Sequence, residues 1–164
     1  MERREYLRYR EILRRKQLFF TKTPCSPGWL LRRRIHGAKC TVCCDEVLHS
    51  PVDSNCTTCY GTGITGGYYP LVAMRGDWSQ GHVPRVTSQT AKEAPGPSQV
   101  QKARVTLFPL PDAKSEDVWI DQGTTYRYLI EKTEPEQYAG SLIGQVLEVS
   151  RLPAHHPVYN FPLP

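Results

Sequence analysis

The sequence predicts a mainly β protein, built as a small antiparallel β-barrel or sandwich with an N-terminal helix, an inserted knuckle module and an extended C-terminal arm. Three observations predict this class. Residues 102–152 hold short segments rich in β-branched and aromatic residues, separated by turn-prone residues. Two Cys-x-x-Cys motifs lie close together nearer the start of the chain. A basic segment with helical periodicity opens it.

Residues 1–39 are predicted to form a basic helix and arm. They contain 12 Lys and Arg but only 3 Asp and Glu, whereas the whole chain of 164 residues has a net charge of +5. Apolar residues recur at helical spacing from Glu2 to about Phe20. Pro24 and Pro27 then remove amide donors that a longer helix would need. Such asymmetry is typical of an arm that meets nucleic acid or an acidic protein surface, and equally of a solvated helix.

Residues 40–70 are predicted to be a zinc-binding module. The pairs Cys40/Cys43 and Cys56/Cys59 are separated by 12 residues. Two thiolates three residues apart can hold zinc from one tight turn, and two such turns complete a tetrahedral shell. The clustered spacing and the lack of a secretory signal pattern favour a metal over disulfides. We therefore expect these four cysteines to bind one structural zinc ion.

Other residues leave alternatives around this site. Cys44 could replace Cys43 as a ligand after a small backbone change, so the register of the first pair stays open. Cys25 is remote and follows a proline, which favours a small buried hydrophobic side chain. His36 and His49 could each supply a fourth ligand, although each is more often a surface or satisfied histidine.

The surroundings of the second pair favour a structural role. Gly61 and Gly63 allow the backbone to curl, so that its amides point toward sulfur and stabilise the thiolates. Four cysteines close the coordination shell, whereas a catalytic zinc keeps an open position. No nucleophile–base pair or phosphate-binding loop is evident in the local sequence, and we expect no enzymatic activity.

The remaining segments connect and end the chain. Residues 71–101 include the polar stretch SQTAKEAPGPSQVQ and are predicted to be a long loop or linker. The stretch GYYPLVAM, residues 67–74, is a candidate short strand. Residues 153–164 contain prolines that argue against a helix or a central strand, and apolar side chains that argue against disorder. We expect them to dock as an arm on a neighbouring subunit. No apolar run near the start approaches the roughly 20 residues that a membrane span needs.

The knuckle that runs into CYGTGITGGYYP, together with a β segment ending in LEVSRLPAHHPVYNFPL, resembles small neck proteins of tailed bacteriophages, of the head–tail connector, head-closure or gateway type. The resemblance covers roughly Cys40–Pro70 and Lys102–Pro164. It implies a structural virion protein, made in the host cytoplasm, that forms a homo-oligomeric ring around the DNA channel. Its partners would be copies of itself, the portal or adaptor ring, and tail-terminator or tail proteins. The basic arm could then contact packaged DNA.

Two other classes share part of these features. CTTCYGTG also resembles the repeat of chaperone zinc modules, but only one repeat is complete here. A nucleic-acid-binding zinc ribbon would need basic and aromatic residues around the knuckles. The stretch between Cys40 and Cys59 instead carries Asp45, Glu46 and Asp53 and lacks Lys and Arg.

Overall fold

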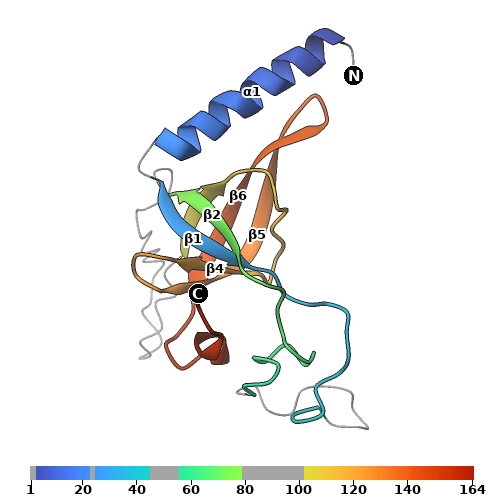
Figure 1. Cartoon of the computed structure of the whole chain (residues 1–164), viewed down its shortest axis with the longest axis vertical. Helices are drawn as coiled ribbons and strands as arrows, with labels where there is room; N and C mark the ends of the chain where they lie inside the picture. Colours follow the sequence, from blue (N-terminus) through green and yellow to red (C-terminus); the bar gives the residue numbers. More distant parts are fainter. Residues whose placement is uncertain (1–2, 23–24, 45–55, 79–101) are drawn as a thin grey trace, which may run out of the picture.

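The chain folds into a closed antiparallel β-barrel with one long helix lying across an end of it (Figure 1). The computed structural model describes residues 3–22, 25–44, 56–78 and 102–164. The elements are α1 (Arg3–Lys22), β1 (Ser26–Leu31), β2 (Val72–Asp77), β3 (Lys102–Leu107), β4 (Val118–Asp121), β5 (Arg127–Tyr138), β6 (Ser141–Arg151) and the 3₁₀ helix η1 (Pro157–Asn160). Around the barrel the strand order is β1-β2-β3-β6-β5-β4. The predicted mainly β class is confirmed.

The barrel extends beyond the range 102–152 predicted for the β domain. Strand β1 pairs with β2 on one side and with β4 on the other, so it closes the barrel. Its sequence SPGWLL contains Pro27 and Gly28, which local patterns associate with breaks. Pairing with partners about 45 and 90 residues away overrides that local preference. The segment expected to be an arm therefore contributes a central strand.

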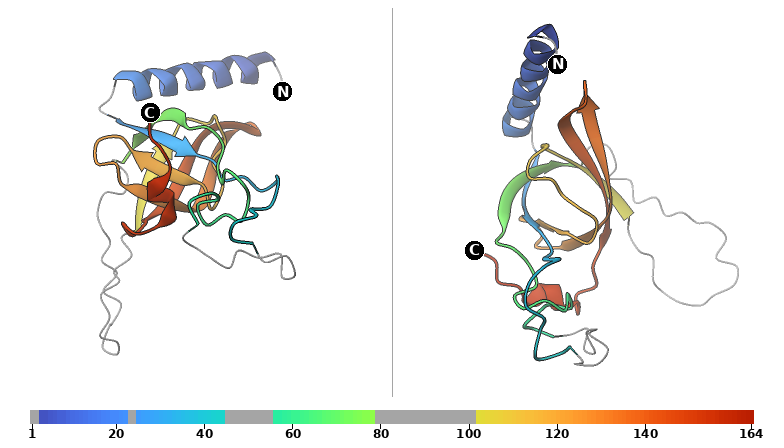
Figure 2. Two further views of the ribbon diagram at one scale, coloured as in Figure 1. Left: turned by 60° about the horizontal axis from the view of Figure 1, so that its bottom comes forward. Right: turned by 90° about the vertical axis from the view of Figure 1, so that its right-hand side faces the viewer.

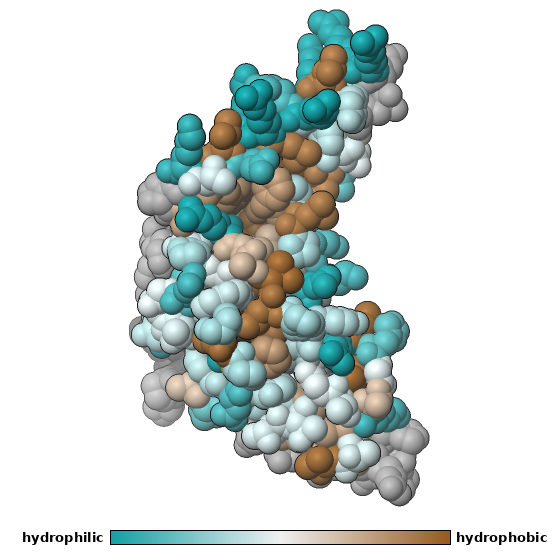
Figure 3. Space-filling model, viewed as in Figure 1, coloured by the Kyte–Doolittle hydropathy of each residue, from teal (hydrophilic) through white to brown (hydrophobic). Residues whose placement is uncertain are grey.

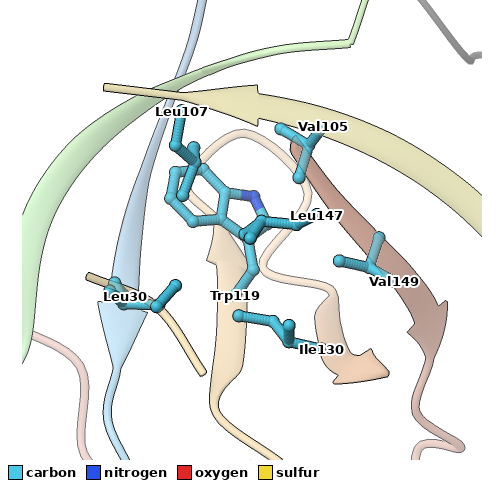
Figure 4. Packing of buried hydrophobic residues seen from close by; sticks show 8 residues of the cluster. Leu30, Val105, Leu107, Trp119, Ile130, Leu147 and Val149 are labelled. Atoms are coloured by element: carbon cyan, nitrogen blue, oxygen red, sulfur yellow. The ribbon is translucent and has the colours of Figure 1, made fainter. Parts of the chain in front are cut away.

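Trp119 fills the barrel interior and is fully buried (Figure 4). Its neighbours come from four other strands and are Leu30, Val105, Leu107, Ile130, Leu147 and Val149. Two glycines make room for the indole. A Cβ atom on Gly28 would lie 2.3 Å from Cζ2 of Trp119, and one on Gly76 would lie 3.2 Å from the same atom. The interior thus combines one large side chain with two positions that carry none.

A buried amide closes one long connection of the barrel. Gln145 is fully buried in β6, and its side chain bonds to the loop between β3 and β4. Its Oε1 accepts from the backbone N–H of Ala113 at 3.0 Å, and its Nε2 donates to the carbonyls of Phe108 and Pro111 at 2.8 Å each. The N–H of Ala113 is buried and the two carbonyls are partly buried, so these bonds replace hydrogen bonds to water that the loop loses on folding.

The predicted N-terminal helix is present and ends at Lys22. Phe20 is its buried residue and meets Phe108 edge-on, with ring centroids 6.2 Å apart. The β5–β6 hairpin extends past the barrel toward α1 (Figures 1 and 2), and Tyr9 donates to the carbonyl of Leu142 at 3.3 Å. Lys16 forms an ion pair with Glu136 of the same hairpin.

The C-terminal segment differs from its prediction, because it packs on its own chain. Val158 is fully buried against the barrel, and the Nη2 of Arg127 donates to the carbonyl of Phe161 at 3.0 Å. Part of the segment is also helical. Pro157 begins η1, where the missing amide donor would have had no helical partner. The expectation of an extended arm on a neighbouring subunit is therefore corrected for these residues.

Candidate metal centre

The cysteine module is the far end of the β1–β2 hairpin, at the opposite end of the molecule from α1 (Figures 1 and 2). Beyond the paired strands, the segment after β1 and the segment before β2 stay together through the isolated bridges Arg33↔Tyr68 and Lys39↔Ile64. A backbone bond from Cys40 N to Gly63 O, 2.9 Å long, continues this contact up to the first cysteine. The pairing of these two segments thus brings both Cys-x-x-Cys turns close together.

A buried carboxylate holds the point where the chain leaves the barrel. Asp117 is 4% exposed, and its two oxygens accept from the backbone amides of Arg33 at 2.7 Å and Lys114 at 2.9 Å. Burial raises the pKa of Asp117, and the two amide donors oppose that rise. The guanidinium of Arg33 also pairs with Glu116. This contact fixes the direction of the strand that leads into the module.

The structure brings together Cys40, Cys43, Cys56 and Cys59. Their sulfur atoms all lie within 4.8 Å of one another, and all four residues are buried. The sulfurs of Cys40 and Cys56 are 3.7 Å apart, and those of Cys43 and Cys59 are 3.2 Å apart. A tetrahedral ZnS₄ centre with bonds of about 2.3 Å has sulfur–sulfur edges of about 3.8 Å. A disulfide bond would need about 2.05 Å, and all four are free thiols.

The electrostatics of the cluster fit a cation. Hydrogen bonds from the backbone N–H groups of Cys59 and, to a smaller extent, Thr58 lower the pKa of Cys56 to about 6, although burial acts in the opposite direction. Burial raises the pKa of Cys59, while amides of Gly61 and Gly63 oppose that rise. Burial and the neighbouring thiols raise the pKa of Cys43. Several buried thiols cannot all ionise without a positive charge among them, and a metal ion supplies that charge.

The glycines after the second pair have the role that the sequence predicts. Tyr60, Gly61 and Gly63 have φ values of 53°, 81° and 77°, which turn the chain sharply around the sulfur of Cys59. Gly67 then passes close by, since a Cβ atom there would lie 2.5 Å from the carbonyl oxygen of Cys59. Larger residues would push this backbone away from the cluster.

The other sequence candidates lie apart from the four sulfurs. Cys44 is half-buried and points its thiol at the carbonyl of Gly63, 3.3 Å away, so the cluster uses Cys43. Cys25 is buried beside the barrel, where burial raises its pKa. His36 is exposed. His49 and most of the predicted linker lie outside the described residues.

The C-terminal segment supports the module through contacts that the sequence does not reveal. The ring of Phe161 lies edge-on to Tyr60 at 5.3 Å and to Tyr68 at 6.0 Å. Arg127 is 3% exposed beneath them, with its guanidinium 5.0 Å from the ring of Tyr159. The only sequence signal for these contacts is that the proline-rich tail is unusually apolar.

No family model, curated protein or solved structure matches the chain. Its own features define a class: a closed antiparallel β-barrel whose β1–β2 hairpin carries a buried four-cysteine cluster able to hold a metal ion. Of the helices among the described residues, none has the length and apolar character needed to cross a bilayer.

Proposed function

We propose that the chain is a structural protein of the phage neck, which joins the portal side of the head to the tail as a homo-oligomeric ring around the DNA channel. The observation that carries this proposal is the two-ended subunit. Helix α1 and the long β5–β6 hairpin project from one end of the barrel, and the cysteine module projects from the other (Figure 2). A ring protein placed between two other layers needs contacts at both ends.

The closed barrel supports the same proposal. Within the barrel the sheet closes on itself, and the part of β5 beyond Ile130 pairs with β6 alone, so the free edge lies on the projecting hairpin. Contacts between subunits must then come from projecting elements, which this chain has at both ends. The charge of α1, with eight Lys and Arg and two Glu, suits an acidic portal surface or the DNA in the channel. Figure 3 shows these hydrophilic side chains over the helix, interrupted by hydrophobic ones.

The metal in this proposal is zinc, and its role is structural. Four cysteine ligands favour zinc among the common metals, and they leave the ion no open position for a substrate. The binding free energy then adds to the folding free energy of a hairpin end that has few apolar contacts of its own. Protein purified under reducing conditions is expected to contain about one zinc per chain by plasma mass spectrometry. A content near zero, with the module still folded by NMR, would reject the metal.

Electron microscopy of the intact tailed particle tests the neck function. The expected result is density for the barrel, repeated as a ring between portal and tail, with α1 and the module facing different layers. A particle whose neck lacks this fold would refute the proposal. A soluble monomer that binds DNA would favour the alternative below.

One observation favours a nucleic-acid-binding zinc protein as an alternative. Arg32 and Arg34 lie over the ring of Tyr69, at 5.5 Å and 5.3 Å, where the module joins the barrel. Basic groups beside an aromatic ring are typical of single-strand binding surfaces. If this function is correct, Tyr69→Ser should weaken binding of a labelled oligonucleotide by roughly tenfold in fluorescence anisotropy. Equal binding by parent and variant would exclude this surface.

A further inference from the structure

A groove separates the N-terminal half of α1 from the tip of the β5–β6 hairpin. Its apolar lining consists of Leu7 and Ile12 from the helix and Tyr138 from the hairpin. Leu7 is 56% exposed, which is high for a leucine on an amphipathic helix that lies against a domain. The tip itself is a tight turn, because Ala139 and Gly140 both have positive φ.

The way in which α1 is held explains why the groove stays open. The described contacts of the helix to the rest of the fold include Tyr9 on the carbonyl of Leu142, the ion pair of Lys16 with Glu136, and the buried Phe20. These contacts lie on one face of the helix and are concentrated toward its C-terminal half. Leu7 lies on a different face and in the other half, so the barrel of this chain does not cover it.

The rim of the groove is positively charged. Arg4, Arg8 and Arg15 line it, with Glu11 as the acidic lining residue. Glu11 is engaged by Arg15 at 2.8 Å. Among the described ion pairs none involves Arg4 or Arg8, so their guanidinium groups remain available to a partner's carboxylates.

We propose that this groove binds an acidic amphipathic protein segment. One apolar side chain of the partner packs between Leu7, Ile12 and Tyr138, and flanking carboxylates pair with Arg4 and Arg8. Arg side chains can hold carboxylates through two parallel hydrogen bonds, which gives the contact direction as well as charge. This inference extends the proposed neck function. It rests on that function only for the location of the partner, which would belong to an adjoining ring.

Charge alone would fit a DNA duplex as well, and the apolar lining decides between the two. Phosphates could satisfy the arginines, but a charged, hydrated duplex backbone has no apolar side chain that could enter the groove between Leu7 and Tyr138. A protein segment satisfies both the charged rim and the apolar lining. This difference predicts that binding depends on apolar contact and is only partly screened by salt.

Fluorescence anisotropy with the full, zinc-loaded chain tests the groove. The probes are a labelled helical peptide with leucines on one face and glutamates on the other, an oligoglutamate of equal length, and a 20-bp DNA duplex. The amphipathic peptide is expected to bind at least about tenfold more tightly than oligoglutamate, because only it buries Leu7. Equal affinity for the two peptides, or no binding of the amphipathic one, would overturn the proposal.

Matched variants of α1 sharpen the result. Leu7→Ser should weaken binding of the amphipathic peptide by roughly tenfold, whereas Leu18→Ser, on an exposed leucine outside the groove, should leave it unchanged. Arg8→Glu should weaken it more than Arg10→Glu, which lies outside the groove lining. Circular dichroism checks that each variant keeps its helix.

Three outcomes would overturn the assignment. If both arginine variants lose affinity for the duplex and Leu7→Ser keeps the parent's affinity for every probe, the helix is a DNA-binding surface. If Leu7→Ser changes only the sedimentation of the free chain, the groove is a contact between copies. If all four variants bind the peptide like the parent, the site lies elsewhere. Failure of the neck function would appear separately, as a missing ring in the particle, and would leave these affinities untouched.

Discussion

Replacing Gly28 with alanine should destabilise the barrel strongly for a change of one methyl group. The new Cβ atom would lie 2.3 Å from Cζ2 of Trp119 and 2.6 Å from the backbone oxygen of Ile120. Carbon atoms in contact normally stand about 3.5–4.0 Å apart. The indole is fully enclosed and the oxygen belongs to β4, which pairs with β1 at this point, so neither can move freely.

The size of the effect follows from these two contacts. Overpacking a core by one methyl group costs roughly 1–3 kcal/mol. Gly28→Ala should reach the upper end, about 3 kcal/mol, because one clash involves backbone and requires β1 and β4 to separate. For a chain of this size that corresponds to a fall in Tm of roughly 6–12 °C. It is a large share of a total stability of roughly 5–15 kcal/mol.

Thermal and urea unfolding, followed by circular dichroism with saturating zinc, measures this change. Gly123→Ala is the matched control, because the nearest atom to its Cβ would be Oδ2 of Asp121 at 3.7 Å. That variant should stay within about 0.5 kcal/mol of the parent. The double variant with Trp119→Phe should cost less than the sum of its single changes, since phenylalanine lacks the indole atoms that clash. If Gly28→Ala unfolds like Gly123→Ala, the packing account of the barrel is wrong.

Four further outcomes are expected. Cys59→Ser should lose zinc and disorder the module, while Cys44→Ser should keep about one zinc per chain; equal zinc contents would disprove the ligand set. Gln145→Leu should lower the unfolding free energy by roughly 2–4 kcal/mol, because it leaves the buried N–H of Ala113 and two partly buried carbonyls without their partner; a neutral result would contradict the network. Deleting residues 157–164 should destabilise the isolated chain by at least about 2 kcal/mol, since it exposes a barrel face. An unchanged Tm would instead support the expectation that this segment docks on a neighbouring subunit. Burial raises the pKa of Tyr68 to about 12, so the contribution of its protonated hydroxyl to folding stability is complete below pH 10 and is lost as pH rises through 12. Tyr68→Phe should therefore reduce alkaline unfolding between pH 10 and 12. Identical pH profiles of parent and variant would contradict this role of Tyr68.

The four-cysteine cluster and the N-terminal helix could be predicted from the sequence because both depend on near neighbours. Two thiols three residues apart meet in one turn, whatever the rest of the chain does. Glycines after the second pair signal the curled backbone around Cys59. The helix follows from periodic apolar residues that end at Pro24 and Pro27. In each case the signal is a short spacing within one segment of the chain.

The tertiary structure decided the features that depend on distant partners. Strand β1 contains Pro27 and Gly28, and it becomes a central strand only because β2 and β4 pair with it from both sides. Only the folded cluster shows that Cys43, and not its neighbour Cys44, faces the other sulfurs.

The C-terminal segment shows the same division. By itself, the sequence determined that this proline-rich tail is too apolar to remain solvated, and that the four spaced cysteines could meet. It could not determine which surface the tail covers, because burial of Val158 is favourable on any apolar surface of matching shape. The barrel of the same chain provides that surface, with Arg127 positioned to bond the tail. Hydrophobic burial has no direction of its own, so only the tertiary structure could choose between this chain and a neighbour.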